Sequence, residues 1–163
     1  MTVKSRLLEI LEKQKGETLS GEKLAEELQC TRAAIWKAVK SLREEGYMIE
    51  AGQNKGYMLM KANDRLSVEA IRPFLLFPDV YIKVYQEVDS TNRAAKAAAI
   101  GGEAGHGSFV LAGSQTEGRG RRGRSFYSPQ DAGIYLSVIL KPHGSLQESL
   151  LLTAEAAVAV YKA

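Results

Sequence analysis

Three successive helix patterns, each with its own start and stop signal, constrain the fold of the first sixty residues most strongly. Gly16 and Gly46 stand where the first and third helices should stop, and Ser20 and Thr31 are residues that commonly cap helix starts. Apolar residues recur at helical spacing between these signals, which predicts helices over 3–15, 20–28 and 31–45. Two short helices joined by a tight turn form the helix-turn-helix pattern.

A β-hairpin is predicted directly after these helices. Segments 47–50 and 57–60 are rich in strand-forming residues, and the residues between them contain Asn and Gly, which favour a tight turn. Three helices followed by a hairpin make a winged helix, with Lys55 at the wing tip. The polar residues 61–65 are the predicted boundary, so we expect a DNA-binding domain over residues 1–63.

One face of the predicted third helix is basic. Its basic residues and its tryptophan lie at helical spacing, and no acid interrupts residues 31–43. A basic stripe on the second helix of a helix-turn-helix suits the major groove and the phosphates. The alternative is a solvated helix face, with Trp36 packed against a neighbouring domain. The DNA-binding candidates are Thr31, Arg32, Trp36, Lys37, Lys40, Arg43 and Lys55.

The composition of the chain places few limits on its function. The net charge of +3 is too small to imply nucleic-acid binding without the stripe. Cys30 is the single cysteine, which excludes an internal disulfide and a two-cysteine zinc site and favours a reduced, cytoplasmic compartment. No apolar stretch long enough for a membrane span is apparent, so no membrane partner is expected. No metal held by protein side chains is expected either.

Residues 64–163 mix strand and helix patterns, which predicts an α+β domain with ligand loops at strand ends. Asp89, Ser90, Thr91 and Asn92 fall between a predicted strand and the start of an alanine-rich helix. Hydroxyls, an amide and free helix-terminal N–H groups converge at such a place, which favours a polar ligand. The alternative is helix capping alone.

The segment Gly118–Arg124, called the Gly/Arg loop below, contains four arginines, three glycines and no acid. Glycine permits close backbone approach to a ligand, and arginine offers a planar fork suited to phosphate or carboxylate. The segment therefore predicts a loop that closes over an anionic ligand. A solvated basic loop and a non-specific RNA-binding segment are the alternatives.

A winged helix, then the polar segment 89–92, then Gln115 with the Gly/Arg loop and Ser128-Pro129 resemble the bifunctional biotin protein ligases that also repress the biotin operon. The resemblance implies a mixed α/β ligase domain that forms biotinyl-5′-AMP from biotin and ATP, with Mg²⁺. Biotin is then transferred to a lysine of the biotin carboxyl carrier protein of acetyl-CoA carboxylase. The resemblance also implies a ligand-bound homodimer that binds operator DNA as a biotin-responsive repressor.

The same resemblance assigns roles to residues. It implies that biotin and the adenylate are bound by Ser90, Thr91, Asn92, Gln115, Arg119, Gly120 and Arg121. Charge developing on the leaving pyrophosphate would be offset by Arg121, Arg119 and Arg124.

Two features depart from the family pattern. Phe126 stands where the family usually has tryptophan, and the family's ligase domain continues beyond position 163. We therefore expect residues 64–163 to be an incomplete ligase domain, with little or no catalysis by this chain alone. The alternatives are a non-catalytic winged-helix repressor with a biotin-sensing half, a lipoate ligase, and a nucleic-acid protein that uses both basic regions.

Overall fold

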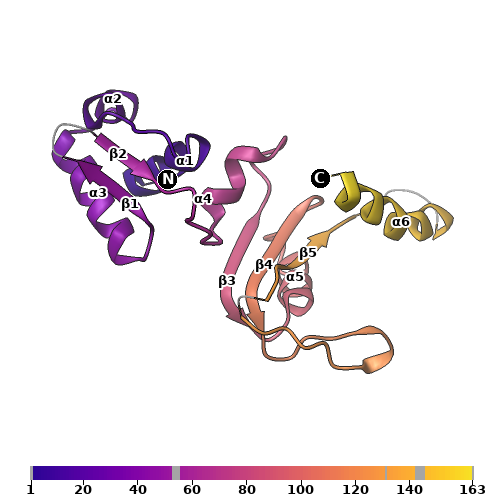
Figure 1. Cartoon of the computed structure of the whole chain (residues 1–163). Coiled ribbons are helices and arrows are strands. Elements are labelled where there is room, and N and C mark those ends of the chain that lie inside the picture. Colours follow the sequence, from indigo (N-terminus) through magenta and orange to yellow (C-terminus); the bar gives the residue numbers. More distant parts are fainter. Residues whose placement is uncertain (1, 53–55, 131, 142–145, 163) are drawn as a thin grey trace. The chain divides into compact units, whose positions relative to one another are not determined.

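The structure is a computed structural model that describes residues 2–52, 56–130, 132–141 and 146–162. It divides into two compact units, Met1–Asp79 and Val80–Ala163, which are described separately (Figure 1).

The first unit begins with three helices: α1 (Val3–Lys13), α2 (Gly21–Glu27) and α3 (Arg32–Glu44). Each starts at a hydroxyl residue whose side chain accepts a backbone N–H of the first turn: Thr2, Ser20 and Thr31. The helices and the hairpin bury one core, formed by Leu7, Leu8, Leu11, Leu24, Leu28, Ile35, Val39, Leu42, Ile49 and Leu59. The predicted helix-turn-helix is confirmed.

The predicted wing is also present. Strands β1 (Ile49–Gly52) and β2 (Gly56–Leu59) pair antiparallel, and Leu19 adds a third short partner by exchanging two 2.8 Å backbone hydrogen bonds with Tyr57. Gly56 has φ +91°, and a Cβ there would lie 2.2 Å from the Leu19 carbonyl oxygen. Only glycine fits this close approach, so Gly56 ties the wing to the loop before α2.

The chain beyond the hairpin stays with the first unit. Helix α4 (Val68–Ile71) and the 3₁₀ turn η1 (Arg72–Phe74) pack against α1, where Arg72 Nε lies 3.9 Å from Glu9 Oε1. Asn63 is buried, and its Oδ1 accepts the Met48 N–H at 3.1 Å. The first compact unit extends to Asp79 and includes the polar segment 61–65, and the domain bounds 1–63 and 64–163 remain a prediction.

The second unit is built on a three-stranded sheet in the order β3 (Ile82–Val88), β4 (Ser108–Gln115), β5 (Tyr135–Ile139). Strands β3 and β4 are parallel and joined through α5 (Thr91–Ile100), whereas β5 runs antiparallel to β4. Helix α5 packs against β4 and β5, burying Ala95 and Ala98 (Figure 1). The short turn η2 (Arg121–Gly123) and helix α6 (Leu146–Lys162) complete the unit.

The predicted fold class is confirmed: a winged helix-turn-helix precedes a mixed α/β region. The parallel β3–α5–β4 unit places the residues after two strands at one sheet end, which is where ligands commonly bind in such sheets. In the part of the chain that the structure describes, no helix is both long and apolar enough to cross a membrane.

Candidate functional site

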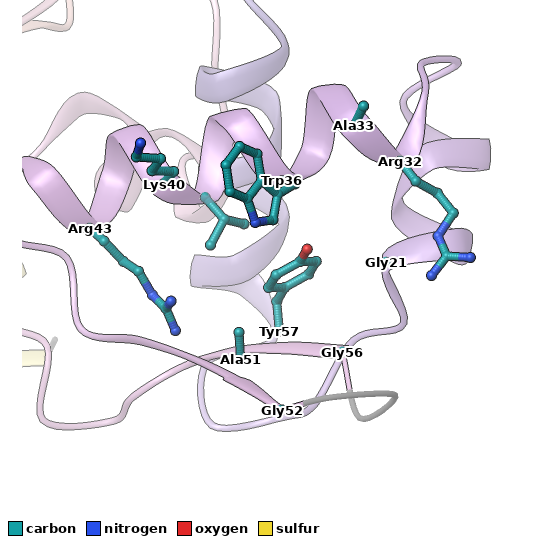
Figure 2. A pocket seen from close by; sticks show the side chains of 11 residues that line it. Gly21, Arg32, Ala33, Trp36, Lys40, Arg43, Ala51, Gly52, Gly56 and Tyr57 are labelled. Atoms are coloured by element: carbon teal, nitrogen blue, oxygen red, sulfur yellow. The ribbon is translucent and has the colours of Figure 1, made fainter.

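A groove in the first unit lies between α3 and the hairpin. It has a volume of about 680 Å³ and is lined on one side by Arg32, Trp36, Lys40 and Arg43 and on the other by Ala51, Gly52, Gly56 and Tyr57. Figure 2 shows the Trp36 and Tyr57 rings between the two sides, with Arg32 and Arg43 toward opposite ends. The large Trp36 side chain is 56% exposed and is not part of the unit's core.

Helix α3 separates its core face from this basic face. Ile35, Val39 and Leu42 are buried as predicted, and the candidate arginines and lysines of the helix are all exposed. Lys37 is exposed too but does not line the groove. The amphipathic spacing thus presents cations beside a hollow, an arrangement suited to a polyanion.

Some candidate DNA-binding residues also have structural contacts. Thr31 Oγ1 accepts the Ala34 N–H at 3.2 Å and caps α3. Arg43 Nε donates to the Ile49 carbonyl oxygen at 2.7 Å, which fixes the end of α3 to β1. The Lys40 ammonium lies 5.7 Å from the centre of the Trp36 ring, within cation–π range. Lys55 falls outside the described residues.

Sequence reasoning missed the hairpin side of the groove. Tyr57 was expected only as part of a strand, yet its ring lies in the groove. A Cβ added to Gly21 would be 3.1 Å from Tyr57 Cε2, so the glycine gives the ring room against the start of α2. The aromatic residue directly after a Gly-rich turn was the available signal.

In the second unit, four side chains form a continuous hydrogen-bonded row, called the polar row below. Gln115 Oε1 accepts the Thr91 N–H at 2.8 Å and the Thr91 hydroxyl at 3.1 Å. Gln115 Nε2 donates to Ser128 Oγ at 3.0 Å, and Ser137 Oγ donates to Thr91 Oγ1 at 2.9 Å. Thr91 and Ser128 are buried. The row joins the start of α5, the end of β4, the middle of β5, and the segment after the Gly/Arg loop.

The structure therefore brings Thr91 and Gln115 together, although they stand 24 positions apart in the chain. Ser90 is the buried N-cap residue of α5, and within the described chain its hydroxyl caps no α5 N–H. Asp89 Oδ1 accepts the Ser90 N–H at 2.6 Å, and Gln115 Oε1 takes the place of an N-cap side chain by accepting the first N–H of α5. Asn92 is exposed on the first turn of α5.

Ser137 is the member of the polar row that sequence reasoning did not single out. It occupies an inward position of β5, whose residues alternate between partly buried and exposed. A lone hydroxyl between apolar neighbours in this strand was the available signal.

The Gly/Arg loop is a hairpin that projects from the end of β4 (orange in Figure 1). Gly120 N–H donates to the Arg124 carbonyl at 2.7 Å, and Phe126 N–H donates to the Gly118 carbonyl at 2.8 Å. The turn is made at Arg122 and Gly123, with φ of +58° and +75°. Gly118 is buried at the loop's base, where an added Cβ would lie 2.7 Å from Ser128 Oγ.

The structure describes the side chains of some of the predicted loop residues and not of others. Arg119 and Arg124 are exposed, and a hollow of about 750 Å³ is lined by Gly120, Arg122, Arg124, Ser125 and Phe126. The side chain of Arg121 lies outside the described part of the chain. The hairpin base is thus attached to the polar row through Gly118, and Arg119, Arg122 and Arg124 extend from the hairpin into solvent.

Comparison with known proteins finds relatives of both parts of the chain. Residues 3–58 match the model of a helix-turn-helix domain, and residues 84–163 match that of the biotin/lipoate A/B protein ligase family. Over 161 residues, 98% of this chain, the sequence is 39% identical to the bifunctional ligase/repressor BirA of Bacillus spizizenii and 38% identical to that of Bacillus subtilis. The chain is homologous to the bifunctional ligase/repressor proteins. It spans about half of their length, covering 49% of each Bacillus protein.

A more distant relative gives the same result. BirA of Escherichia coli is 36% identical over 137 residues, which are 84% of this chain and 41% of that protein. The family resemblance inferred from the Gly/Arg loop and the polar segment is therefore confirmed.

Proposed function

We propose that the second unit carries the biotin- and adenylate-binding part of an ATP-dependent biotin protein ligase. The observation that supports this most is the junction of the Thr91–Gln115 pair with the base of the Gly/Arg loop at Gly118. The ureido group of biotin presents two N–H donors and one carbonyl acceptor. Hydroxyls and a primary amide can match that set by exchanging their mutual hydrogen bonds for bonds to the ligand.

In this proposal the polar row, Ser90 and Asn92 hold biotin, and the Gly/Arg loop covers the adenylate. Attack of the biotin carboxylate on the α-phosphate of ATP forms the acyl–phosphate bond of biotinyl-5′-AMP and releases pyrophosphate. Two anions must approach each other, so cations lower the barrier by offsetting the charge gathered on the phosphates. Arg119, Arg121 and Arg124 supply those cations, with Arg121 the most important of the three.

Mg²⁺ enters this scheme as part of the MgATP substrate. Among the described residues, no group of three His, Cys, Asp or Glu side chains is placed to hold a metal ion. Magnesium is commonly bound through substrate phosphates and water, which requires no such group.

We further propose that the first unit binds operator DNA, so that the protein is also a biotin-responsive repressor. Support comes from the exposed cations of α3 beside the groove and from the match to a helix-turn-helix domain. A two-part operator would be bound by a homodimer favoured by the adenylate, which requires the ligand to bind the dimer more tightly than the monomer. The proposed acceptor of biotin is a carrier-protein lysine, and the proposed compartment is the cytoplasm.

Biotin-dependent ATP–pyrophosphate exchange tests the ligase proposal directly. We expect slow exchange by the unaltered chain and a further decrease of about 100-fold in Arg121→Ala, the usual cost of removing one charge-stabilising group. Arg6→Ala, which removes an arginine of α1, is the control and should exchange like the unaltered chain. Operator binding that responds to biotin without any exchange would instead support the non-catalytic repressor.

A further inference from the structure

Arg93, in the first turn of α5, links the ends of two strands. Its Nη2 donates to Glu117 Oε2 at 2.7 Å, and its Nη1 donates to Asp89 Oδ2. Asp89 follows β3, and Glu117 follows β4. One planar guanidinium therefore spans the two parallel strand ends that flank the polar row.

Backbone hydrogen bonds also link the residues that follow β4 to the end of β3. Glu117 N–H donates to the Asp89 carbonyl at 2.8 Å, and Thr116 N–H donates to the Val88 carbonyl at 3.0 Å. The next residue is Gly118, at the base of the Gly/Arg loop. The two ion pairs of Arg93 with Asp89 and Glu117, called the Arg93 fork below, thus lie on the solvent-exposed side of this junction. The Thr91–Gln115 hydrogen bonds lie on its buried side.

Electrostatics gives the fork a second effect. A cation in the first turn of a helix faces the positive end of the helix dipole, so Arg93 needs the two carboxylates as partners. Hydrogen bonding to Glu117, followed by the charge of Asp89, raises the pKa of Arg93 above its ordinary value. Without the guanidinium, two uncompensated carboxylates would stand beside the base of the Gly/Arg loop, which is proposed to receive anions.

We propose that Arg93 is a positioning residue, whose fork to Asp89 and Glu117 holds the base of the Gly/Arg loop against the first turn of α5. The identity of the ligand in this inference rests on the proposed function, but the fork itself does not. A lysine at position 93 would keep the charge and lose the fork, because one ammonium is a point charge and cannot present two parallel donors to separate carboxylates.

Amide hydrogen exchange of Thr116 and Glu117 in the ligand-free chain tests the positioning role. We expect Arg93→Ala to accelerate exchange of both amides by about threefold or more, a size typical of exposed ion pairs acting together. Arg93→Lys should resemble Arg93→Ala. The control is Lys96→Ala, which removes an exposed cation from the same helix and should leave both rates unchanged. Unchanged exchange rates in Arg93→Ala, or exchange rates in Arg93→Lys equal to those of the unaltered chain, would contradict the positioning role of Arg93.

Calorimetric titration with biotinyl-5′-AMP tests its consequence for the ligand. We expect Arg93→Ala to bind about threefold to tenfold more weakly, and the deficit to shrink at high salt because screening weakens repulsion from Asp89 and Glu117. A deficit that does not depend on salt would contradict the electrostatic effect. If the unaltered chain itself fails to bind the adenylate, the proposed function is wrong, whereas the exchange rates still decide the role of Arg93.

Discussion

Replacing Gly118 by alanine should disrupt the junction between the Gly/Arg loop and the polar row. An added Cβ would lie 2.4 Å from the Phe126 carbonyl oxygen and 2.7 Å from Ser128 Oγ, far inside normal contact. These neighbours cannot simply move away. The Phe126 carbonyl accepts the Ser128 hydroxyl at 3.1 Å, and the Phe126 N–H donates to the Gly118 carbonyl at 2.8 Å.

The expected cost follows from these contacts. Overpacking by one methyl group costs about 1–3 kcal/mol, and loss of two hydrogen bonds worth about 1 kcal/mol each gives a similar figure. We therefore expect Gly118→Ala to lower the free energy of unfolding of the second unit by about 2 kcal/mol. For a domain of this size, that corresponds to a decrease in Tm of about 8–16 °C.

Thermal unfolding followed by far-UV circular dichroism provides the assay, with Gly133→Ala as the control. Gly133 has no heavy atom within 4 Å of an added Cβ. The fluorescence of Trp36, the one tryptophan of the chain, reports on the first unit in a parallel thermal scan. The second unit should melt earlier in Gly118→Ala, with the Trp36 transition unchanged. Equal transitions in the two alanine variants would refute the close packing of the loop base.

Three further predictions concern both units. Gln115→Ala should weaken biotin binding about 10- to 100-fold in a calorimetric titration, because it leaves buried polar groups of the site unpaired; unchanged affinity would remove Gln115 from the biotin site. Lys37→Ala should weaken binding to all DNA sequences alike and reduce the slope of the logarithm of the DNA-binding constant against log salt by about 0.9. Fluorescence anisotropy measures this slope, and an unchanged slope would mean that Lys37 contacts no phosphate. The Lys4 hydrogen bond lowers the pKa of Glu45 below 4.5. The pair therefore stabilises the first unit above that pH and ceases to do so as the pH falls through the folded-state pKa. Lys4→Ala should cost under about 1 kcal/mol at pH 7 and nothing in acid, by urea unfolding, and an equal cost at both pH values would count against the pair.

Local signals in the sequence were enough to predict most of the first unit. Hydroxyl residues at positions 20 and 31 predicted two helix starts, and both side chains cap their helices. The wing followed from strand-forming residues around a Gly-rich turn. The burial of Asn63 could not be predicted, because it depends on a hydrogen bond to Met48 that polarity alone does not reveal.

The candidate ligand site was predictable only in part. The polar segment and the Gly/Arg loop are visible as residue types, and parallel pairing of β3 with β4 explains why Thr91 and Gln115 meet. Ser137 was missed because its contact with Thr91 depends on the antiparallel pairing of β5. Arg93 was missed because its two partners belong to different strand ends.

Titration of biotinyl-5′-AMP into the isotope-labelled chain, followed by amide NMR, is the most direct test of the proposed ligand site. Thr91 N–H, which donates to Gln115 Oε1, and the amides of Gly120 and Phe126 in the loop hairpin should shift together with one affinity. Binding that leaves Thr91 unshifted, or that shifts only amides of the first unit, would contradict a shared site for biotin and its adenylate at the polar row and the Gly/Arg loop.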